Sequence, residues 1–168
     1  YMVPGAVGAE EDGQPRMVTT PWYDHEIPMT QAAELGTKKV MSGHATLGLV
    51  VTTDGTITDI PREDYIAAEN RAIQDMKATG KPFLVVINSR QPGAAPARDL
   101  KQELDGRFGI SCVVLDCQAV DAEGIGGLLK ALLYTFPMTK LCVYLPRWMD
   151  ALEQDHPVKS ELYGTLLR

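Results

Sequence analysis

Two uninterrupted apolar runs dominate the hydrophobic pattern, and each one ends abruptly in polar residues. The first run is Leu47–Val51, which is followed by Thr52–Thr56, and the second is Pro82–Ile87, which is followed by Asn88–Arg90. Apolar residues at successive positions, rather than alternating ones, are typical of strands that are buried on both faces of a parallel sheet. The pattern therefore predicts two buried strands that deliver their loops to the same edge.

Helical periodicity separates these strands and continues after them. The pattern predicts strands over 47–53, 83–88 and 110–115. It predicts helices over 28–42, 97–107 and 122–135, and a further helix that begins at Asp59 as its N-cap and ends at Gly80. A strand, helix, strand succession in one sheet forms a right-handed crossover. The expected fold class is therefore α/β, with a mostly parallel sheet and flanking helices.

The two ends of the chain differ from this alternating middle. Residues 1–27 are dense in proline and glycine and are expected to form an extended loop, whereas Pro146 is expected to open a last helix that runs to Arg168. The expected organisation is therefore a loop over 1–27, an α/β domain over 28–145 and the start of a helical segment over 146–168.

Composition narrows the class of protein without indicating a reaction. Of the 168 residues, 45% are hydrophobic and 23% are charged, which is typical of a globular domain. The net charge of −6 and the scattered Lys and Arg residues argue against nucleic-acid binding. No apolar run approaches the roughly 18 residues of a membrane helix, and the start lacks the pattern of a secretion signal, so a cytoplasmic location is expected.

Ligands of open α/β sheets bind beyond the carboxyl ends of the strands, which here are residues 52–56, 88–91 and 116–119. A phosphate loop of the form G-x-x-x-x-G-K-[ST] is absent from the sequence. The one dense glycine cluster, Gly124–Gly127, has an ordinary explanation as the start of a helix after Asp121. The chain alone is therefore not expected to carry out P-loop chemistry.

Other reactive side chains have simple structural explanations. The histidines, His25, His44 and His156, lie far apart in the sequence, without the spacing of metal ligands. The carboxylates Asp54, Asp59, Glu63 and Asp64 are explained by turn and helix-cap chemistry. The cysteines, Cys112, Cys117 and Cys142, are expected to be buried thiols in or beside strands. Trp22 and Trp148 are expected to be packing anchors.

Several stretches carry more than a hydrophobic pattern: Val3–Ala6, Gly13–Met17, Thr20–Tyr23, Ile27–Pro28, Ala32–Val40, His44–Gly48, Val51–Ile57, Gly80–Phe83, Val86–Ser89 and Leu145–Trp148. Together they closely resemble the stage IV sporulation protein A family, over nearly all of the chain. The resemblance implies a morphogenetic ATPase of endospore-forming bacteria, with the fold of the translation-factor-like (TRAFAC) P-loop GTPases. Such a protein uses ATP and Mg²⁺ to polymerise into the basement layer of the spore coat.

The resemblance also implies partners and a location. It implies self-association into a homopolymer, contact with a small amphipathic membrane peptide and with coat proteins, and a place on the forespore surface in the mother cell. In the family, the P-loop, the threonine that senses the γ-phosphate and the Walker B aspartate precede the position that matches Tyr1. The chain alone is therefore expected to be inactive and to leave an open sheet edge along strand 47–53.

Carried over residue by residue, the resemblance assigns Tyr1–Gly5 to the switch II region. Asn88–Gln91 occupies the place of the GTPase motif N-K-x-D, with Ser89 for the lysine and Gln91 for the aspartate that reads guanine. Loss of that acceptor agrees with the use of ATP. Asp116–Gln118 stands where GTPases have S-A-K. The implied nucleotide-contacting residues are Asn88, Ser89, Asp116 and Cys117, and no catalytic or metal-binding residue is assigned.

Two other functions are consistent with the same residues. One is a nucleotide-independent α/β module for protein interaction, which would use residues 1–27 and Trp148 as its contact surface. The other is a free-standing α/β domain that binds an unrelated small molecule beyond its strand ends.

Overall fold

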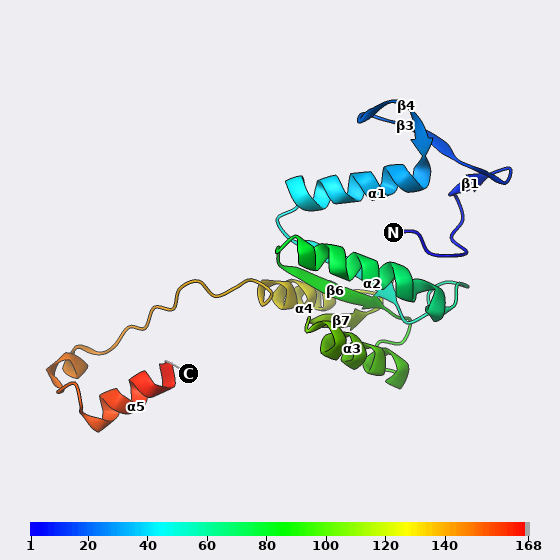
Figure 1. Cartoon of the computed structure of the whole chain (residues 1–168). Helices are drawn as coiled ribbons and strands as arrows, with labels where there is room; N and C mark the ends of the chain where they lie inside the picture. The colour runs from blue at the N-terminus through cyan, green and yellow to red at the C-terminus, as the bar shows by residue number, and fades with distance from the viewer. Residues whose placement is uncertain (167–168) are drawn as a thin grey trace. The chain divides into compact units, whose positions relative to one another are not determined.

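A three-stranded parallel sheet forms the centre of the computed structural model, which describes residues 1–166 (Figure 1). Its strands lie in the order β5 (Gly48–Thr53), β6 (Phe83–Asn88) and β7 (Cys112–Leu115). The α/β class and the parallel sheet are therefore confirmed. The bounds of β6 are those predicted, whereas β5 begins one residue later and β7 two residues later than expected.

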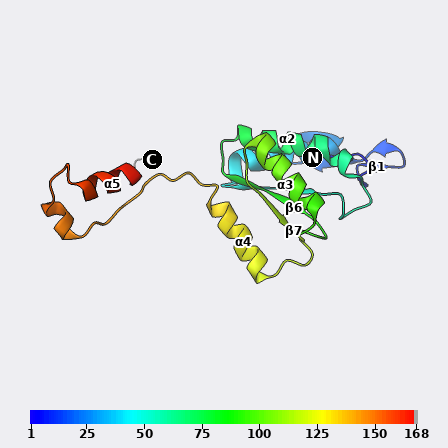
Figure 2. The same ribbon diagram turned by 90° about the horizontal axis from the view of Figure 1, so that it is seen from below.

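Helices cover both faces of this sheet (Figure 2). The helices α2 (Arg62–Ala78) and α3 (Ala95–Phe108) pack on one face, and α4 (Ala122–Leu133) contacts β6 and β7 from the other. Fully buried side chains of α2, α3 and β6, among them Ile73, Leu104 and Ile87, join in the core between them. Because the strands and these helices share one continuous core, the core sets the positions of the strands relative to one another.

Helix α1 (Met29–Lys39) continues through a π-helical turn, η1 (Val40–His44), before the chain enters the sheet. The Lys81 ammonium donates hydrogen bonds to three carbonyl oxygens at this helix end, Met41 O (2.6 Å), Ser42 O (2.9 Å) and Ala45 O (2.7 Å). A cation is favoured there by the unpaired carbonyls and by the helix dipole. Lys81 therefore ties the end of α1 to the segment that leads into β6.

Residues 10–28 form two hairpins, so the expectation of a loop throughout 1–27 was wrong for this part of the segment. β1 (Glu10–Glu11) pairs with β2 (Gln14–Pro15), and β3 (Met17–Thr20) pairs with β4 (Tyr23–Pro28), both antiparallel. The turn between β1 and β2 is Asp12-Gly13, with positive φ at both residues. Asp-Gly in this conformation is a favoured two-residue hairpin turn. The prolines and glycines therefore punctuate short strands rather than mark an unstructured segment.

Helix α2 differs from its prediction in its cap and in its buried face. Asp59 does not cap it, because the N-cap position is occupied by Pro61, which offers no side-chain acceptor. Glu63 and Asp64 do lie in the first turn, as predicted. On its surface Ile66 is exposed, whereas the charged Glu69 is buried.

Two apolar surfaces of the sheet unit are exposed to solvent. β5 is an edge strand, as the expected open edge requires, but it is not buried on both faces, because Leu49 is 45% and Val51 is 61% exposed. The outer face of α4 carries Ile125, Leu129 and Leu133, all exposed and one helical turn apart. Both groups of exposed apolar side chains are candidate contact surfaces, because exposed apolar patches often mark interaction sites.

The chain divides into two compact units, Tyr1–Phe136 and a second one from Pro137 onward. In the second unit, the single helix expected from Pro146 is replaced by a short 3₁₀ helix, η2 (Arg147–Ala151), and by α5 (Pro157–Leu166). Pro157 favours the start of α5, because proline is tolerated in the first turn of a helix. The expected end at Arg168 lies outside the described residues. Within residues 1–166, none of the helices has the length and apolar character needed to span a membrane.

Candidate functional site

The carboxyl ends of the three parallel strands lie in register along one edge of the sheet. Thr53 of β5 lies opposite Asn88 of β6, and Asn88 lies opposite Leu115 of β7. Three loops, 54–61, 89–94 and 116–121, therefore start side by side at this edge. This is the edge at which open α/β sheets bind ligands.

Asn88 ties the second loop to the third. Its side-chain Oδ1 accepts a hydrogen bond from Cys117 N (2.9 Å), and Asp116 Oδ1 accepts one from Gln118 N (2.9 Å) to close a tight turn. An Asp side chain that binds the amide two residues on stabilises such a turn. The structure thus brings the four residues predicted for the site together at one edge: Asn88, Ser89, Asp116 and Cys117. What they bind stays a prediction.

A hydroxyl group connects the first loop to the second. Thr56 Oγ1 donates to Asp54 Oδ1 (2.6 Å) and accepts a hydrogen bond from Arg90 N (3.0 Å). The Ser89 hydroxyl, which is fully buried, accepts a hydrogen bond from Gln91 N (3.1 Å), and its proximity lowers the pKa of Asp54. The prediction that Asp54 serves only turn chemistry was therefore incomplete, since this carboxylate also connects two loops.

The environment of Asp54 keeps this carboxylate charged. Partial burial raises its pKa, but hydrogen bonds from Ser89, from Thr56 and from backbone amides lower it more, so the pKa lies below the ordinary value. The contribution of these bonds to stability is therefore complete above the ordinary pKa of Asp, and it is lost only as the pH falls through the lower pKa of the folded state. Near neutral pH the carboxylate only accepts hydrogen bonds, so the Thr56 hydroxyl donates to it.

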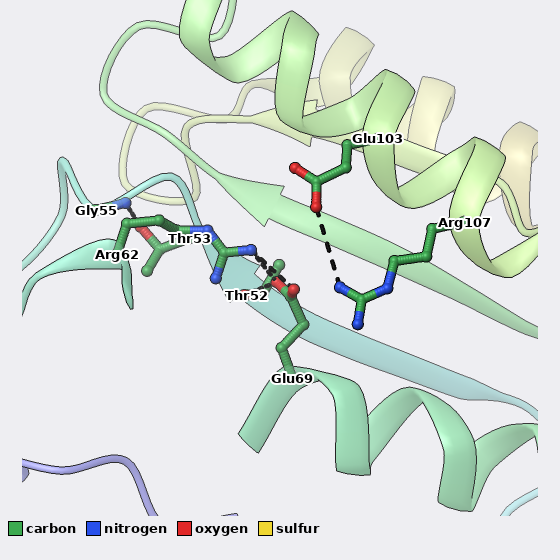
Figure 3. Close-up of polar contacts among 7 residues, drawn as sticks. All are labelled: Thr52, Thr53, Gly55, Arg62, Glu69, Glu103 and Arg107. Carbon is green, nitrogen blue, oxygen red and sulfur yellow. Dashed lines mark hydrogen bonds and ion pairs between the residues drawn. The ribbon is translucent and has the colours of Figure 1, made fainter. Parts of the chain in front are cut away.

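A buried ion pair that sequence reasoning missed fixes the start of the first loop (Figure 3). The Glu69 side chain, 2% exposed, accepts hydrogen bonds from Thr52 Oγ1 (2.6 Å) and from Arg62 Nη2 (2.8 Å to Oε1). Arg62 also crowds Gly55, where a Cβ would lie 3.1 Å from Arg62 Cβ and where φ is +90°. Glycine is required by that backbone conformation. Within α2 the ion pair fixes the Glu69 side chain, which holds the end of β5 against α2 through Thr52.

The cysteines do not provide a reactive thiol at this edge. Burial raises the pKa of Cys112 to about 12, with a further contribution from its hydrogen bond to Asp105, and burial beside Asp116 raises the pKa of Cys117. Thiols with raised pKa values stay protonated near neutral pH and are poor nucleophiles. Cys112 is buried as predicted, whereas Cys117 and Cys142 are exposed, because both lie outside the strands.

The remaining candidate groups do not form a phosphate or metal site within the described residues. Gly124 N, in the dense glycine cluster, donates to Asp121 Oδ1 (2.8 Å) and so is used to cap α4. Among residues 1–166, no three His, Cys, Asp or Glu side chains are grouped so that they could hold a metal ion. At the strand-end loops, the Gln91 side chain is exposed, and its carboxamide can both donate and accept hydrogen bonds.

The parallel sheet, with polar loops joined by hydrogen bonds at the carboxyl ends of its strands, defines the class of α/β protein that binds ligands at this edge. Comparison with known proteins identifies the particular family, because residues 1–137 match the family described as stage IV sporulation protein A, ATPase domain. The chain belongs to this family, which confirms the resemblance seen in the sequence.

Curated relatives agree with this assignment. The chain is 43% identical over 156 residues to stage IV sporulation protein A of Bacillus subtilis (strain 168), and 40% identical over 166 residues to that of Clostridioides difficile (strain 630). These alignments cover 93% and 99% of the chain but 32% and 34% of the relatives. The chain therefore spans about a third of the length of the curated relatives it matches. No solved structure matches the chain.

Proposed function

We propose that the strand-end loops hold the adenine base of ATP, in an ATPase domain with the TRAFAC type of P-loop GTPase fold. The observation that carries this proposal is the hydrogen bond from Cys117 N to Asn88 Oδ1, which joins the loops Asn88–Gln91 and Asp116–Gln118 at the ligand edge. In P-loop proteins of this class, these two loops contact the base. The family name, which includes an ATPase domain, supports the use of a nucleotide.

The chemistry of Gln91 favours adenine over guanine. Adenine presents an amino donor beside a ring-nitrogen acceptor, and a carboxamide offers one acceptor and one donor group. Guanine presents two adjacent N–H donors on the same edge, which a carboxylate accepts and a carboxamide does not. A site built around Gln91 therefore forgoes the guanine preference that an aspartate would provide.

The triphosphate and Mg²⁺ require residues that this chain does not contribute. The sequence has no G-x-x-x-x-G-K-[ST] motif, and residues 1–166 offer no cluster of metal ligands. In the proposed arrangement, the remainder of the full-length protein supplies these groups. The bound Mg-ATP supplies the phosphoanhydride bond that is hydrolysed, and this chain orients the base.

The segment Tyr1–Gly5 is proposed to be the switch II region. Its Tyr1 hydroxyl donates to Asp75 of α2 (2.6 Å), and the Tyr1 ring lies 5.8 Å from the Arg71 guanidinium. Arg71 in turn forms an ion pair with Glu34 of α1 (2.6 Å). A movement of this segment would therefore reach both α2 and α1.

The whole protein is proposed to act at the forespore surface in the mother cell, as part of the basement layer of the spore coat. There it self-associates into a homopolymer and contacts a small amphipathic membrane peptide and coat proteins. The exposed apolar side chains on the outer face of α4 support contacts with further protein surfaces. The same exposed residues also favour the second candidate function, a nucleotide-independent interaction module.

Replacing Asn88 with alanine tests which of the two functions holds. The substitution removes the hydrogen bond between Asn88 Oδ1 and Cys117 N, so the loop at Cys117 loses its connection to Asn88. We therefore expect the KM for ATP of the full-length protein to rise about ten-fold. This is the effect of losing one hydrogen bond between uncharged groups in a binding site. The kcat should change little, because the groups around the phosphates are untouched. Steady-state ATP hydrolysis provides the measurement.

Gln102→Ala is the matched control, because it removes an exposed carboxamide of α3 far from the loops in sequence. Its KM should equal that of the unmodified protein. An unchanged KM in Asn88→Ala, with ATP hydrolysis intact, would favour a base site elsewhere. Absence of ATP binding by the unmodified protein would favour the interaction module.

A further inference from the structure

We propose that Asp54 is a positioning residue for the base-binding loop, acting through the hydroxyl of Thr56. The inference rests on the proposed function, because it concerns the loop Asn88–Gln91 that is assigned to the base. Asp54 lies in a different loop, which follows β5, and it belongs to the turn that the sequence explains by local chemistry alone.

Asp54 is the first residue after the paired part of strand β5. The ladder between β5 and β6 extends to Thr53 and Asn88, and one further backbone hydrogen bond, from Asp54 N to Asn88 O, is long at 3.4 Å. Beyond this point the two chains separate into loops. There the Asp54 carboxylate provides the next connection between the two loops, through hydrogen bonds of its side chain.

One relay runs from the carboxylate to an amide of the second loop. Thr56 Oγ1 lies 2.6 Å from Asp54 Oδ1 and 3.0 Å from Arg90 N. The Thr56 hydroxyl donates to Asp54 and accepts from this amide, which uses the hydroxyl as both donor and acceptor. The next amide, Gln91 N, donates to the buried Ser89 hydroxyl (3.1 Å), which also lowers the pKa of Asp54.

This arrangement fixes the residue that is proposed to read the base. The amide of Gln91 is held by Ser89, and Gln91 O accepts a hydrogen bond from Ala94 N (2.9 Å). The backbone of Gln91 is therefore held on both sides, while its side chain is exposed. A binding group whose backbone is fixed in advance loses less conformational entropy when the ligand binds. Removal of Asp54 should therefore weaken base binding without touching the phosphates.

The test uses Asp54→Ala in the full-length protein, with Asp59→Ala as the matched control. Asp59 is an exposed aspartate of the same loop, and the expected cap role for it is not found. Two readouts are measured: hydrogen exchange of the amides of Arg90 and Gln91, and the KM and kcat for ATP. In Asp54→Ala we expect exchange at least about ten-fold faster and a KM about five-fold higher, with kcat within about two-fold. Asp59→Ala should match the unmodified protein in both.

Thr56→Val guards against a loss of folding in Asp54→Ala. Thr56 is exposed, so Thr56→Val should still fold, and it removes the hydroxyl that connects Asp54 to Arg90 N. We expect faster exchange at Arg90 and a smaller rise in KM, whereas Thr56→Ser, which keeps the hydroxyl, should restore both values. A KM change without an exchange change would contradict the positioning role.

The two proposals fail in different ways. If the unmodified protein binds ATP but Asp54→Ala and Thr56→Val leave exchange and KM unchanged, the role of Asp54 is overturned and the proposed function stands. If the unmodified protein does not bind ATP, the proposed function is overturned, and the exchange rates alone decide whether Asp54 holds the loop.

Discussion

Replacing Glu69 with alanine should lower the free energy of unfolding of the sheet unit by about 3 kcal/mol, at the lower end of the cost of breaking a buried ion pair. The Arg62 side chain is only 20% exposed and would keep its charge without a partner, and the buried Thr52 hydroxyl would lose its acceptor. Native-state hydrogen exchange of the amides of β5 and β6 measures this free energy within the full-length protein.

Glu103→Ala provides the matched control for Glu69→Ala. Glu103 also pairs with an arginine, Arg107, but the two atoms are 4.0 Å apart and both side chains are about half exposed (Figure 3). Exposed ion pairs of this kind contribute little. Glu103→Ala should therefore leave exchange at β5 unchanged. Equal effects of the two substitutions would show that the burial of Glu69 has no energetic consequence.

Replacing Lys81 with methionine should cost about 2 kcal/mol, since it leaves three carbonyl oxygens at the end of α1 and η1 without their charged donor. Methionine keeps most of the length of the side chain, so the loss is mainly that of the ammonium group. Faster hydrogen exchange across α1 provides the measurement, because this helix end is tied to the sheet unit through Lys81.

Lys77→Met is the corresponding control, since Lys77 donates to a single carbonyl oxygen, Phe108 O (2.6 Å), at the end of α3. Its cost should be about 1 kcal/mol and confined to α3. If Lys77→Met loosened α1 as much as Lys81→Met does, the assignment of Lys81 as the tie would be wrong.

Sequence predicts an element well when the apolar residues of that element alone determine whether it is buried. β6 has the predicted bounds because Phe83–Ile87 is continuously apolar and is covered on both faces. β5 has a similar run, but its exposure depends on which strand lies beside it, and an apolar pattern cannot distinguish an edge strand from a central one. The first hairpin was missed because its two strands, Glu10–Glu11 and Gln14–Pro15, have only two residues each and contain no alternating apolar positions.

The position of the candidate site residues at one edge of the sheet was predicted, whereas the hydrogen bonds that connect them were not. The strand-end rule placed Asn88 and Cys117 at one edge, because register alone determines it. The relay from Asp54 depends on side-chain directions across two loops, which no spacing reveals. Glu69 was missed because a glutamate in a helix is normally exposed. One signal was available: Glu69 shares a helical face with Ala72, Ile73 and Met76, all of which are buried.

Photolabelling with 8-azido-ATP tests the central claim, that the loops after β6 and β7 hold the base of ATP, most directly. The azide is attached to the adenine ring, so the label marks the residues around the base in the full-length protein. Peptide mapping should locate the label within 88–91 or 116–119, with labelling reduced by excess ATP and by Asn88→Ala. A label that ATP displaces but that maps consistently outside both loops would contradict the account.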